Sequence, residues 1–447
     1  MIYSKKLIKT SLLLASPGII SIFISLVSIP IHLNIAGLEN YGNYILFHFL
    51  FTLGNLLNLG IGKSIVVCSN SNSNIKQYIG YEGFIYTFFI SFIFLLFFLI
   101  LLFIEFKFLY LVDAPIILIL GIISTIIFIS LESTLQAYEK FKLLSFSNFL
   151  FYSLSISVPS ISLLFFNDLD VKSLILLSLS IKIFVVVYII IFIFKKKLII
   201  KSSKHTLLQN LKKNSQWLTL NSIFVQIYDV FDKYLVKIFI GPAALATYSI
   251  PQQLTGKLSV ISKGFSSFLL PFLSRKNYKD DDFNQTLDIF IILIPFIIFL
   301  LFPFFDFILK VWLREQYQYE MVLLTKIFTL SIIFGCISHI LITKFEANQK
   351  MRINFVFELL FLPFFIGLIL YLSFNKYSLV YFSITILLKE LILLVCRLIF
   401  YRKEVKKIIL YFSYLTFFII LLILSFFNNL IFYTLLIIII IAYMIKK

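Results

Sequence analysis

The chain has 447 residues, of which 61% are hydrophobic and only 13% are charged. Soluble domains average about 45–50% apolar and about 25% charged residues, so this composition excludes a soluble globular protein and predicts a polytopic membrane protein. The formal net charge is +18, which would suggest a nucleic-acid partner in a soluble chain. In a membrane protein the lysines and arginines instead indicate orientation, and no nucleic-acid partner is expected.

Apolar runs of about 20 residues, the length that crosses a bilayer, recur along the whole chain. The first run follows Lys5, Lys6 and Lys9 and has no small-residue cleavage site, so we expect a retained helix rather than a signal peptide. The expected spans are residues 10–31, 44–67, 79–104, 115–136, 146–166, 172–194, 217–240, 244–273, 286–309, 324–345, 353–374, 377–399, 408–426 and 430–445. The sequence therefore predicts an all-α fold of about fourteen transmembrane helices.

Lysines and arginines orient these spans through the positive-inside rule. With the N-terminus in the cytoplasm, most of them fall in cytoplasmic segments, the largest of which lies between residues 195 and 216. Both termini are then expected in the cytoplasm. The three cysteines, Cys68, Cys336 and Cys396, form no CxxC pair, and the histidines form no HExxH motif, so no metal or organic cofactor is expected.

Two predicted outer turns share one pattern. The first reads GLENYGNY from Gly37 to Tyr44, and the second reads GPAALATY from Gly241 to Tyr248. Each lies between the first two helices of a block of six, which indicates a parallel repeat about an axis along the membrane normal. We therefore expect a six-helix lobe at 1–200, a basic cytoplasmic linker at 201–215, a second six-helix lobe at 216–400 and an extra transmembrane helix pair at 401–447.

The stretch from Trp217 to Arg275 is apolar enough to cross the membrane twice, yet it carries many polar residues. A charge at the centre of a membrane helix costs at least about 2.5–3.5 kcal/mol on insertion scales. Gln226, Asp229 and Lys233 fall on one stripe of a helix. That stripe is expected to face protein or water rather than lipid.

Three segments carry a resemblance to a known family. They read AGLENYGNYILFHFLFTLGNLLNLGIGKSIV at Ala36–Val66, DKYLVKIFIGPAALATYSIPQQL at Asp232–Leu254 and LLPFLSR at Leu269–Arg275. The chain resembles the polysaccharide-transporter branch of the multidrug/oligosaccharidyl-lipid/polysaccharide (MOP) exporters, the O-antigen flippases of Wzx type. It departs from the family at Ala246, where a second Gly is common, which makes the second turn less diagnostic.

The resemblance implies a MATE-like fold that flips an undecaprenyl-diphosphate-linked repeat unit of O-antigen or capsule across the inner membrane by alternating access. Membrane lipids are implied as surroundings, and a polysaccharide polymerase and a chain-length regulator are implied as further partners. Such a cargo needs cations for its phosphates and neutral donors for its sugar hydroxyls. The substrate-binding candidates are Lys182, Lys233, Lys257, Lys389, Asn55, Asn58, Gln226 and Gln253.

Three carboxylates are candidates for coupling transport to a proton or sodium gradient, namely Asp229, Asp232 and Glu390. A structural role is weighed beside the functional one: Asp229, Asp232 and Lys233 as an internal ion pair, and Asn55 and Asn58 as interhelical hydrogen-bond formers. Near span ends, Arg397 is expected to snorkel to an interface and Glu358 to be structural.

Rival functions remain open at this point. A lipid II flippase, or a flippase for another lipid-linked glycan, would need the same kind of cavity. A MATE-type antiporter of small cations should have a net acidic cavity, whereas the mid-span lysines outnumber the carboxylates here. A membrane glycan polymerase or ligase would need a sizeable outer loop, and the longest predicted one runs only from Lys310 to Leu323, so the chain is not expected to be an enzyme.

Overall fold

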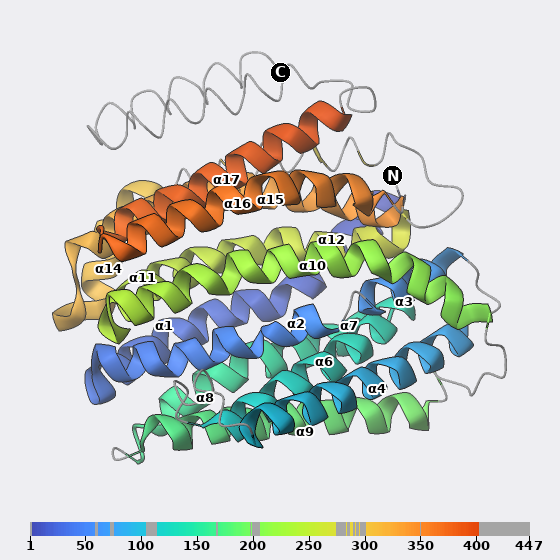
Figure 1. Ribbon diagram of the computed structural model, residues 1–447, viewed down its shortest axis with the longest axis horizontal. Coiled ribbons are helices and arrows are strands. Elements are labelled where there is room, and N and C mark those ends of the chain that lie inside the picture. Colours follow the sequence, from blue (N-terminus) through green and yellow to red (C-terminus); the bar gives the residue numbers. More distant parts are fainter. Residues whose placement is uncertain are drawn as a thin grey trace.

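The computed structural model describes residues 2–58, 61–71, 76–103, 114–166, 169–196, 206–273, 301–348 and 350–401, together with positions 198, 283, 287, 288, 291 and 295. Among these residues every regular element is a helix, and the helices lie roughly side by side in a long bundle (Figure 1). Within the same residues, seven helices are long and apolar enough to cross a membrane. The all-α membrane class is confirmed; the full set of expected spans extends beyond the described ranges.

The first lobe contains the helices up to residue 195. Its elements are α1 (Ile2–Phe51), α2 (Leu53–Leu57), α3 (Ile61–Ser71), α4 (Lys76–Phe103), α6 (Pro115–Ala137), α7 (Phe141–Asn148), a π-helical segment (Phe149–Leu154), α8 (Ser155–Ser162) and α9 (Val171–Lys195).

The second lobe contains the helices from residue 206 onward. Its elements are α10 (Thr206–Phe239), α11 (Pro242–Gly256), a 3₁₀ turn (Lys257–Ser259), α12 (Val260–Leu273), a 3₁₀ turn (Phe302–Phe304), α14 (Phe305–Leu313), a 3₁₀ turn (Arg314–Gln316), α15 (Tyr319–Ala347), α16 (Met351–Phe374) and α17 (Leu379–Phe400).

The two repeated turns meet at one end of the bundle, which we call the turn end. Gly37 kinks α1 with φ +81°, and Gly241 precedes α11 with φ +127°; both lie in the region that favours glycine. Gly42 packs directly on the second turn, because a Cβ at Gly42 would lie 2.0 Å from the carbonyl oxygen of Pro242. The shared pattern thus places one tight turn from each lobe in mutual contact.

Several expected spans are interrupted. The span expected at 44–67 is divided among α1, α2 and α3, the span at 146–166 contains the π-helical segment, and the span at 244–273 is broken by the 3₁₀ turn at Lys257–Ser259. Helix α10 begins at Thr206, inside the range expected to be a linker. The predicted helix pair at 401–447 lies outside the described residues except for Tyr401.

Helix α1 belongs to the first lobe and lies along its contact with the second (Figure 1). It packs against α7, α8 and α9 on one side and against α10, α11 and α12 on the other. The largest buried hydrophobic cluster combines residues of both lobes, such as Tyr44 of α1 with Leu245 of α11. The lobes therefore share an apolar core along α1, and polar residues on this contact are the ones placed to change partners if the lobes move.

Candidate functional site: a polar seam between the lobes

Polar side chains of α10 and α11 reach across to α1, and we call this contact the lobe seam. Thr52, just after α1, donates to Gln226 Oε1 of α10 at 3.0 Å. Gln253 of α11 donates through Nε2 to the hydroxyl of Tyr41 at 3.0 Å. Two of the predicted substrate-binding amides therefore face the other lobe, which agrees with the expectation that the stripe on α10 faces protein or water.

Two predicted lysines also contact α1 at the lobe seam. Lys233 lies with its ammonium 4.6 Å from the ring centroid of Phe49, and Lys257 donates to Ser21 Oγ at 3.1 Å. Lys257 opens the 3₁₀ turn between α11 and α12. Such a tightened turn inside a membrane helix changes the direction in which side chains project, because the α-helical ladder is interrupted.

The carboxylates near the lobe seam differ in their surroundings. Asp232 is fully buried, accepts from the hydroxyl of Tyr248 at 2.8 Å and lies 3.5 Å from Lys233 Nζ. Lys233 also donates to the main-chain carbonyl of Asp229. The side chain of Asp229 is exposed instead and lies within electrostatic range of Lys389. The internal ion-pair interpretation thus fits Asp232 and Lys233, while Asp229 remains accessible.

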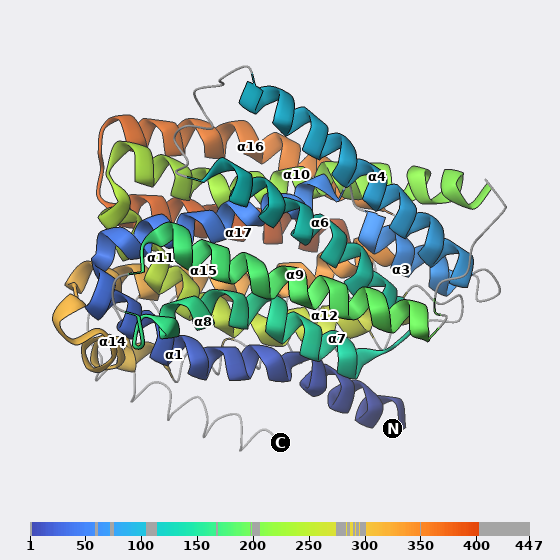
Figure 2. The same cartoon turned by 90° about the horizontal axis from the view of Figure 1, so that it is seen from below.

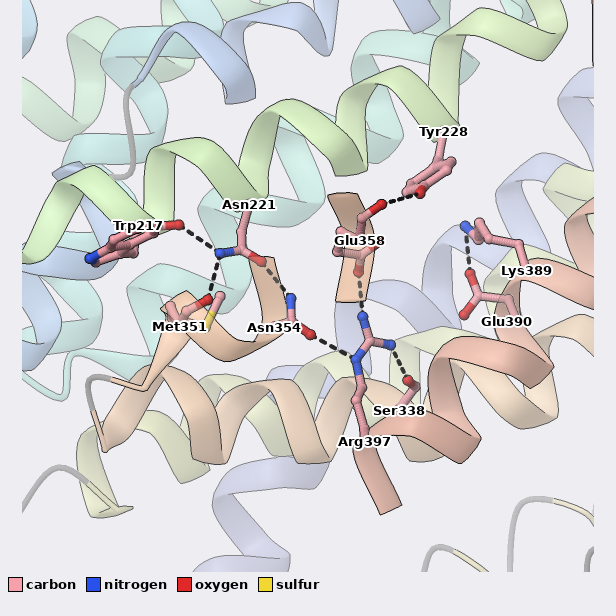
Figure 3. Close-up of polar contacts among 10 residues, drawn as sticks. All are labelled: Trp217, Asn221, Tyr228, Ser338, Met351, Asn354, Glu358, Lys389, Glu390 and Arg397. Atoms are coloured by element: carbon pink, nitrogen blue, oxygen red, sulfur yellow. Dashed lines mark hydrogen bonds and ion pairs between the residues drawn. The ribbon is translucent and has the colours of Figure 1, made fainter. Parts of the chain in front are cut away.

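Lys389 and Glu390 form an ion pair at 2.7 Å on α17. The ammonium of Lys389 also lies 4.6 Å from the ring centroid of Tyr228 on α10. Figure 3 shows this pair beside a longer polar network that links α10, α15, α16 and α17. The structure therefore places Lys389 in the second lobe with an acid partner of its own.

That network centres on Arg397, for which the snorkelling prediction is wrong. Arg397 is 2% exposed and ion-paired with Glu358, and it donates to Asn354 Oδ1 at 2.8 Å and to Ser338 Oγ (Figure 3). Asn354 in turn bonds Asn221 of α10. A guanidinium near a span end was expected to reach water, but here the buried acid and amides satisfy its planar set of donors, so burial becomes tolerable.

Lys182 lies in the interior of the first lobe among aromatic rings. Lys182 is only 5% exposed, and its ammonium lies 4.0 Å from the ring centroid of Phe151 and 5.6 Å from that of Phe51. Within the described part of the chain it makes no ion pair and no hydrogen bond. Phe151 belongs to the π-helical segment, which is the kind of local irregularity that often accompanies function.

Two histidines of α1 extend from this aromatic cluster toward the turn end. His48 contacts the Phe51 ring at 5.7 Å between centroids, and its Nε2 atom has no hydrogen-bond partner in the described structure. His32 is fully buried between Ser160 and Asn40, at 3.0 and 3.2 Å. Sequence patterns do not single out either histidine, because a lone His in an apolar run has no spacing signal.

The two asparagines of the site prediction differ. Asn58 donates to the carbonyl of Ile126 at 3.1 Å and to Ser130 Oγ at 3.0 Å, and its Oδ1 accepts from the N–H of Gly62. All its polar atoms therefore act in packing α6 against the α2–α3 connection, as the interhelical alternative expects. Asn55 is half-buried, and its side chain makes no hydrogen bond among the described residues.

An ion pair that sequence patterns do not predict joins the lobes away from the turn end. Lys63 of α3 forms an ion pair with Glu346 of α15, which joins the two lobes there. Charge counting alone places Lys63 in a cytoplasmic segment and says nothing of Glu346. No group of three or more His, Cys, Asp or Glu side chains that could hold a metal occurs among the described residues.

Comparisons with known proteins identify the family and the fold of the chain. The chain matches the family described as "Polysaccharide biosynthesis protein" over residues 7–277. It is 26% identical over 185 residues to a Shigella flexneri protein named "Putative O-antigen transporter", a match that covers 40% of this chain and 44% of that protein. The chain thus spans less than half the length of this curated relative.

Solved structures extend the likeness to nearly the whole chain. A mutant of the Vibrio cholerae MATE transporter VcmN superposes with a TM-score of 0.66 at 14% identity, covering 92% of this chain and all of that one. A MOP-superfamily transporter from Pyrococcus furiosus, for which a binding pocket of reversed polarity is described, gives a TM-score of 0.68 at 12% identity, covering 90% and 96%. At these identities the likeness is one of fold, and it confirms the predicted MATE-like architecture.

Proposed function

This chain belongs to the polysaccharide biosynthesis protein family, and on that premise we propose that it is a flippase for undecaprenyl-diphosphate-linked oligosaccharides. Its cargo would be a repeat unit of O-antigen or capsule, moved across the cytoplasmic membrane with both termini of the protein on the cytoplasmic side. The family and the MATE-like fold support a membrane transporter rather than an enzyme. The identity of the cargo is our proposal and goes beyond the family and the fold.

The observation that carries the proposal is the chemistry of the lobe seam. A diphosphate sugar cannot cross hydrocarbon unaided, since its charges and hydroxyls would lose their hydration without compensation. Lys233 and Lys257 offer ammonium groups, and Gln226 and Gln253 offer amide donors, all along the contact with α1. This inventory suits an anionic head that carries many hydroxyls.

Transport then follows from an exchange of partners. In this structure the seam donors contact Ser21, Phe49, Thr52 and Tyr41 of the α1 region. Separation of the lobes removes these partners and leaves the donors available to phosphates and hydroxyls. Rocking of one lobe against the other would move the head between the two sides while the lipid tail stays in the bilayer.

A proton or sodium gradient would supply the driving force through Asp229, Asp232 or Glu390. Asp229 is the best placed of the three, since its side chain is exposed and lies near Lys389, whereas Asp232 is enclosed by Tyr248 and Lys233. Binding of a cation at Asp229 would weaken its hold on Lys389 and leave that ammonium better able to bind the anionic head of the cargo. A polymerase and a chain-length regulator acting on the delivered repeat unit complete the proposed set of partners.

One rival shares most of this chemistry. A lipid II flippase also binds a diphosphate lipid with a sugar head, so the chemistry of the seam fits both functions. A flipping assay that compares the two cargoes distinguishes them. An antiporter of small cations fits less well, because Lys233 and Lys257 contribute positive charge to the seam. The reversed pocket polarity described for the Pyrococcus furiosus transporter supports the idea that this fold can serve a cargo other than small cations.

The test is complementation of cells that lack their own repeat-unit flippase. We expect Lys257→Met and Gln253→Leu to lower surface glycan by about tenfold or more, since each removes a donor to the cargo. Lys310→Met is the matched control, because Lys310 is exposed and paired with Asp306 away from the lobe seam. Normal glycan in both seam variants, at equal expression, contradicts the proposal.

A further inference from the structure

A groove of about 500 Å³ lies at the turn end between α1 of the first lobe and α14 of the second. Figure 2 shows α14 beside the kinked end of α1. Leu26, Val27 and Pro30 form one wall, and Phe307 and Val311 contribute to the other. Because the walls come from different lobes, the shape of the groove depends on how the lobes sit against each other.

Pro30 fixes the base of this groove. Proline has no N–H, so the carbonyl of Leu26, four residues earlier in α1, has no intrahelical donor. The indole of Trp312 supplies one, donating from Nε1 to the Leu26 carbonyl at 2.6 Å across the two lobes. A carbonyl left without a donor in the membrane would cost several kcal/mol, and this bond therefore ties α14 to α1 at the edge of the groove.

The walls of the groove are apolar and exposed. Val27, Phe307 and Val311 are 56%, 66% and 60% exposed, respectively. In a membrane-spanning bundle such side chains face acyl chains. Acyl chains of the bilayer would therefore cover this surface in any case. The groove differs from other lipid-facing surface in the polar residues at its opening.

The mouth carries Arg314 and Asn34, both exposed. Within the described residues neither side chain makes a hydrogen bond or ion pair. The nearby acid of α14, Asp306, is occupied, because Lys310 and Tyr317 donate to it at 2.8 and 2.6 Å. Arg314 is the C-cap of α14 and has a positive φ of +50°, which residues other than glycine rarely adopt.

We propose that this groove binds an anionic glycerophospholipid of the bilayer. One acyl chain lies along Phe307 and Val311, while the phosphate accepts hydrogen bonds from the guanidinium of Arg314 and the amide of Asn34. The guanidinium matches phosphate oxygens in a bidentate manner. A zwitterionic lipid brings a cation toward Arg314 and is disfavoured. Bound across α1 and α14, the lipid stabilises the arrangement in which the lobes touch at the turn end.

The test uses the purified full chain in nanodiscs that contain a trace of photoactivatable phosphatidylglycerol or phosphatidylcholine, with no cargo present. We expect phosphatidylglycerol to label peptides of α1 and α14, and phosphatidylcholine to label them weakly. Val311→Trp fills the groove and Arg314→Gln removes the charge, and each is expected to lower labelling by about tenfold. Lys376→Gln is the control and leaves labelling unchanged, because Lys376 is exposed and does not line the groove.

Three results would overturn this assignment. They are equal labelling by the two lipids, labelling that survives in both variants, and a photocrosslink that places residues 402–447 of the chain itself in the groove. A fourth result would overturn it as well: if added undecaprenyl-diphosphate oligosaccharide displaces the probe, the groove belongs to the cargo instead. Monodisperse elution of each variant shows that lost labelling is not lost folding. Because transport is not measured, failure here leaves the proposed function untouched.

Discussion

The two lobes bury cations in opposite ways. In the second lobe Lys233, Lys389 and Arg397 each lie beside a carboxylate, at Asp232, Glu390 and Glu358 respectively. In the first lobe Lys182 is just as deeply placed, but aromatic rings surround it and no described acid pairs with it. Carboxylates thus compensate the burial of these three cations of the second lobe, whereas no described carboxylate compensates the burial of Lys182 in the first.

The largest effect is expected at Arg397. Changing Arg397 to Met strands Glu358 in the membrane interior, and breaking a buried pair on one side costs about 3–5 kcal/mol. We expect a marked fall in the thermal unfolding temperature of the purified protein. The double variant Arg397→Met with Glu358→Leu should recover much of the loss. A single variant as stable as wild type would show that the network of Figure 3 contributes no stability.

Lys182 provides the opposite case. Lys182→Met leaves no carboxylate without a partner and keeps an apolar side chain against Phe151, so we expect unchanged or raised stability. If the ammonium serves the phosphates of the cargo once the lobes open, the same variant loses surface glycan. Unfolding temperature and surface glycan together separate the two roles of Lys182. If the lysine is only structural, both should fall in the variant. If surface glycan stays at the wild-type level, Lys182 is not part of the substrate site.

An intermediate effect is expected at Lys389. The side chain of its partner Glu390 is 21% exposed, against 5% for Glu358, so Lys389→Met strands the less deeply buried of the two carboxylates. Removal of one partner of a partly exposed pair should cost about 1–3 kcal/mol, less than at Arg397. Chemical unfolding of the two variants side by side checks the order, and a larger loss at Lys389 would contradict it.

Among the variants expected to lose stability, the smallest loss is expected at Asp170, the N-cap of α9. Its carboxylate accepts from the N–H and hydroxyl of Ser173, and these bonds hold the pKa of Asp170 below its usual range. The folded protein therefore gains stability above the ordinary carboxyl pKa and loses it as the pH falls through the lowered value. Asp170→Ala should cost about 1 kcal/mol at most at neutral pH, with the difference from wild type vanishing in acid.

Sequence reasoning succeeded where a pattern has one physical cause. Apolar runs predicted the membrane helices, and the shared Gly-to-Tyr pattern predicted two equivalent turns. At both turns the structure has a glycine with positive φ, Gly37 and Gly241. It failed where burial depends on a partner far along the chain. Nothing local to Arg397 indicates that Glu358 and Asn354 on the preceding helix will satisfy it, and nothing local to Leu26 indicates that Trp312 will reach its carbonyl.

The lysines show the same limit for the site. Mid-span position alone marks Lys182, Lys257 and Lys389 as equivalent, because each carries the same insertion cost. The structure distinguishes them by partner: rings for Lys182, a serine of α1 for Lys257 and an acid for Lys389. The rings around Lys182 and the serine beside Lys257 come from tertiary packing, whereas the acid of Lys389 is its neighbour in the sequence, Glu390. The sequence could therefore propose the set of residues but not predict the partners of Lys182 and Lys257.

The most direct test of the central claim is flipping in proteoliposomes that hold the purified protein. Two fluorescent glycolipids of equal chain length are compared, one with an undecaprenyl-diphosphate head and one with the same oligosaccharide on a neutral linkage. We predict rapid translocation of the diphosphate lipid, slow translocation of the neutral one, and loss of the difference in Lys257→Met. Equal rates for both lipids in the wild-type protein would contradict the claim that seam cations recognise the cargo.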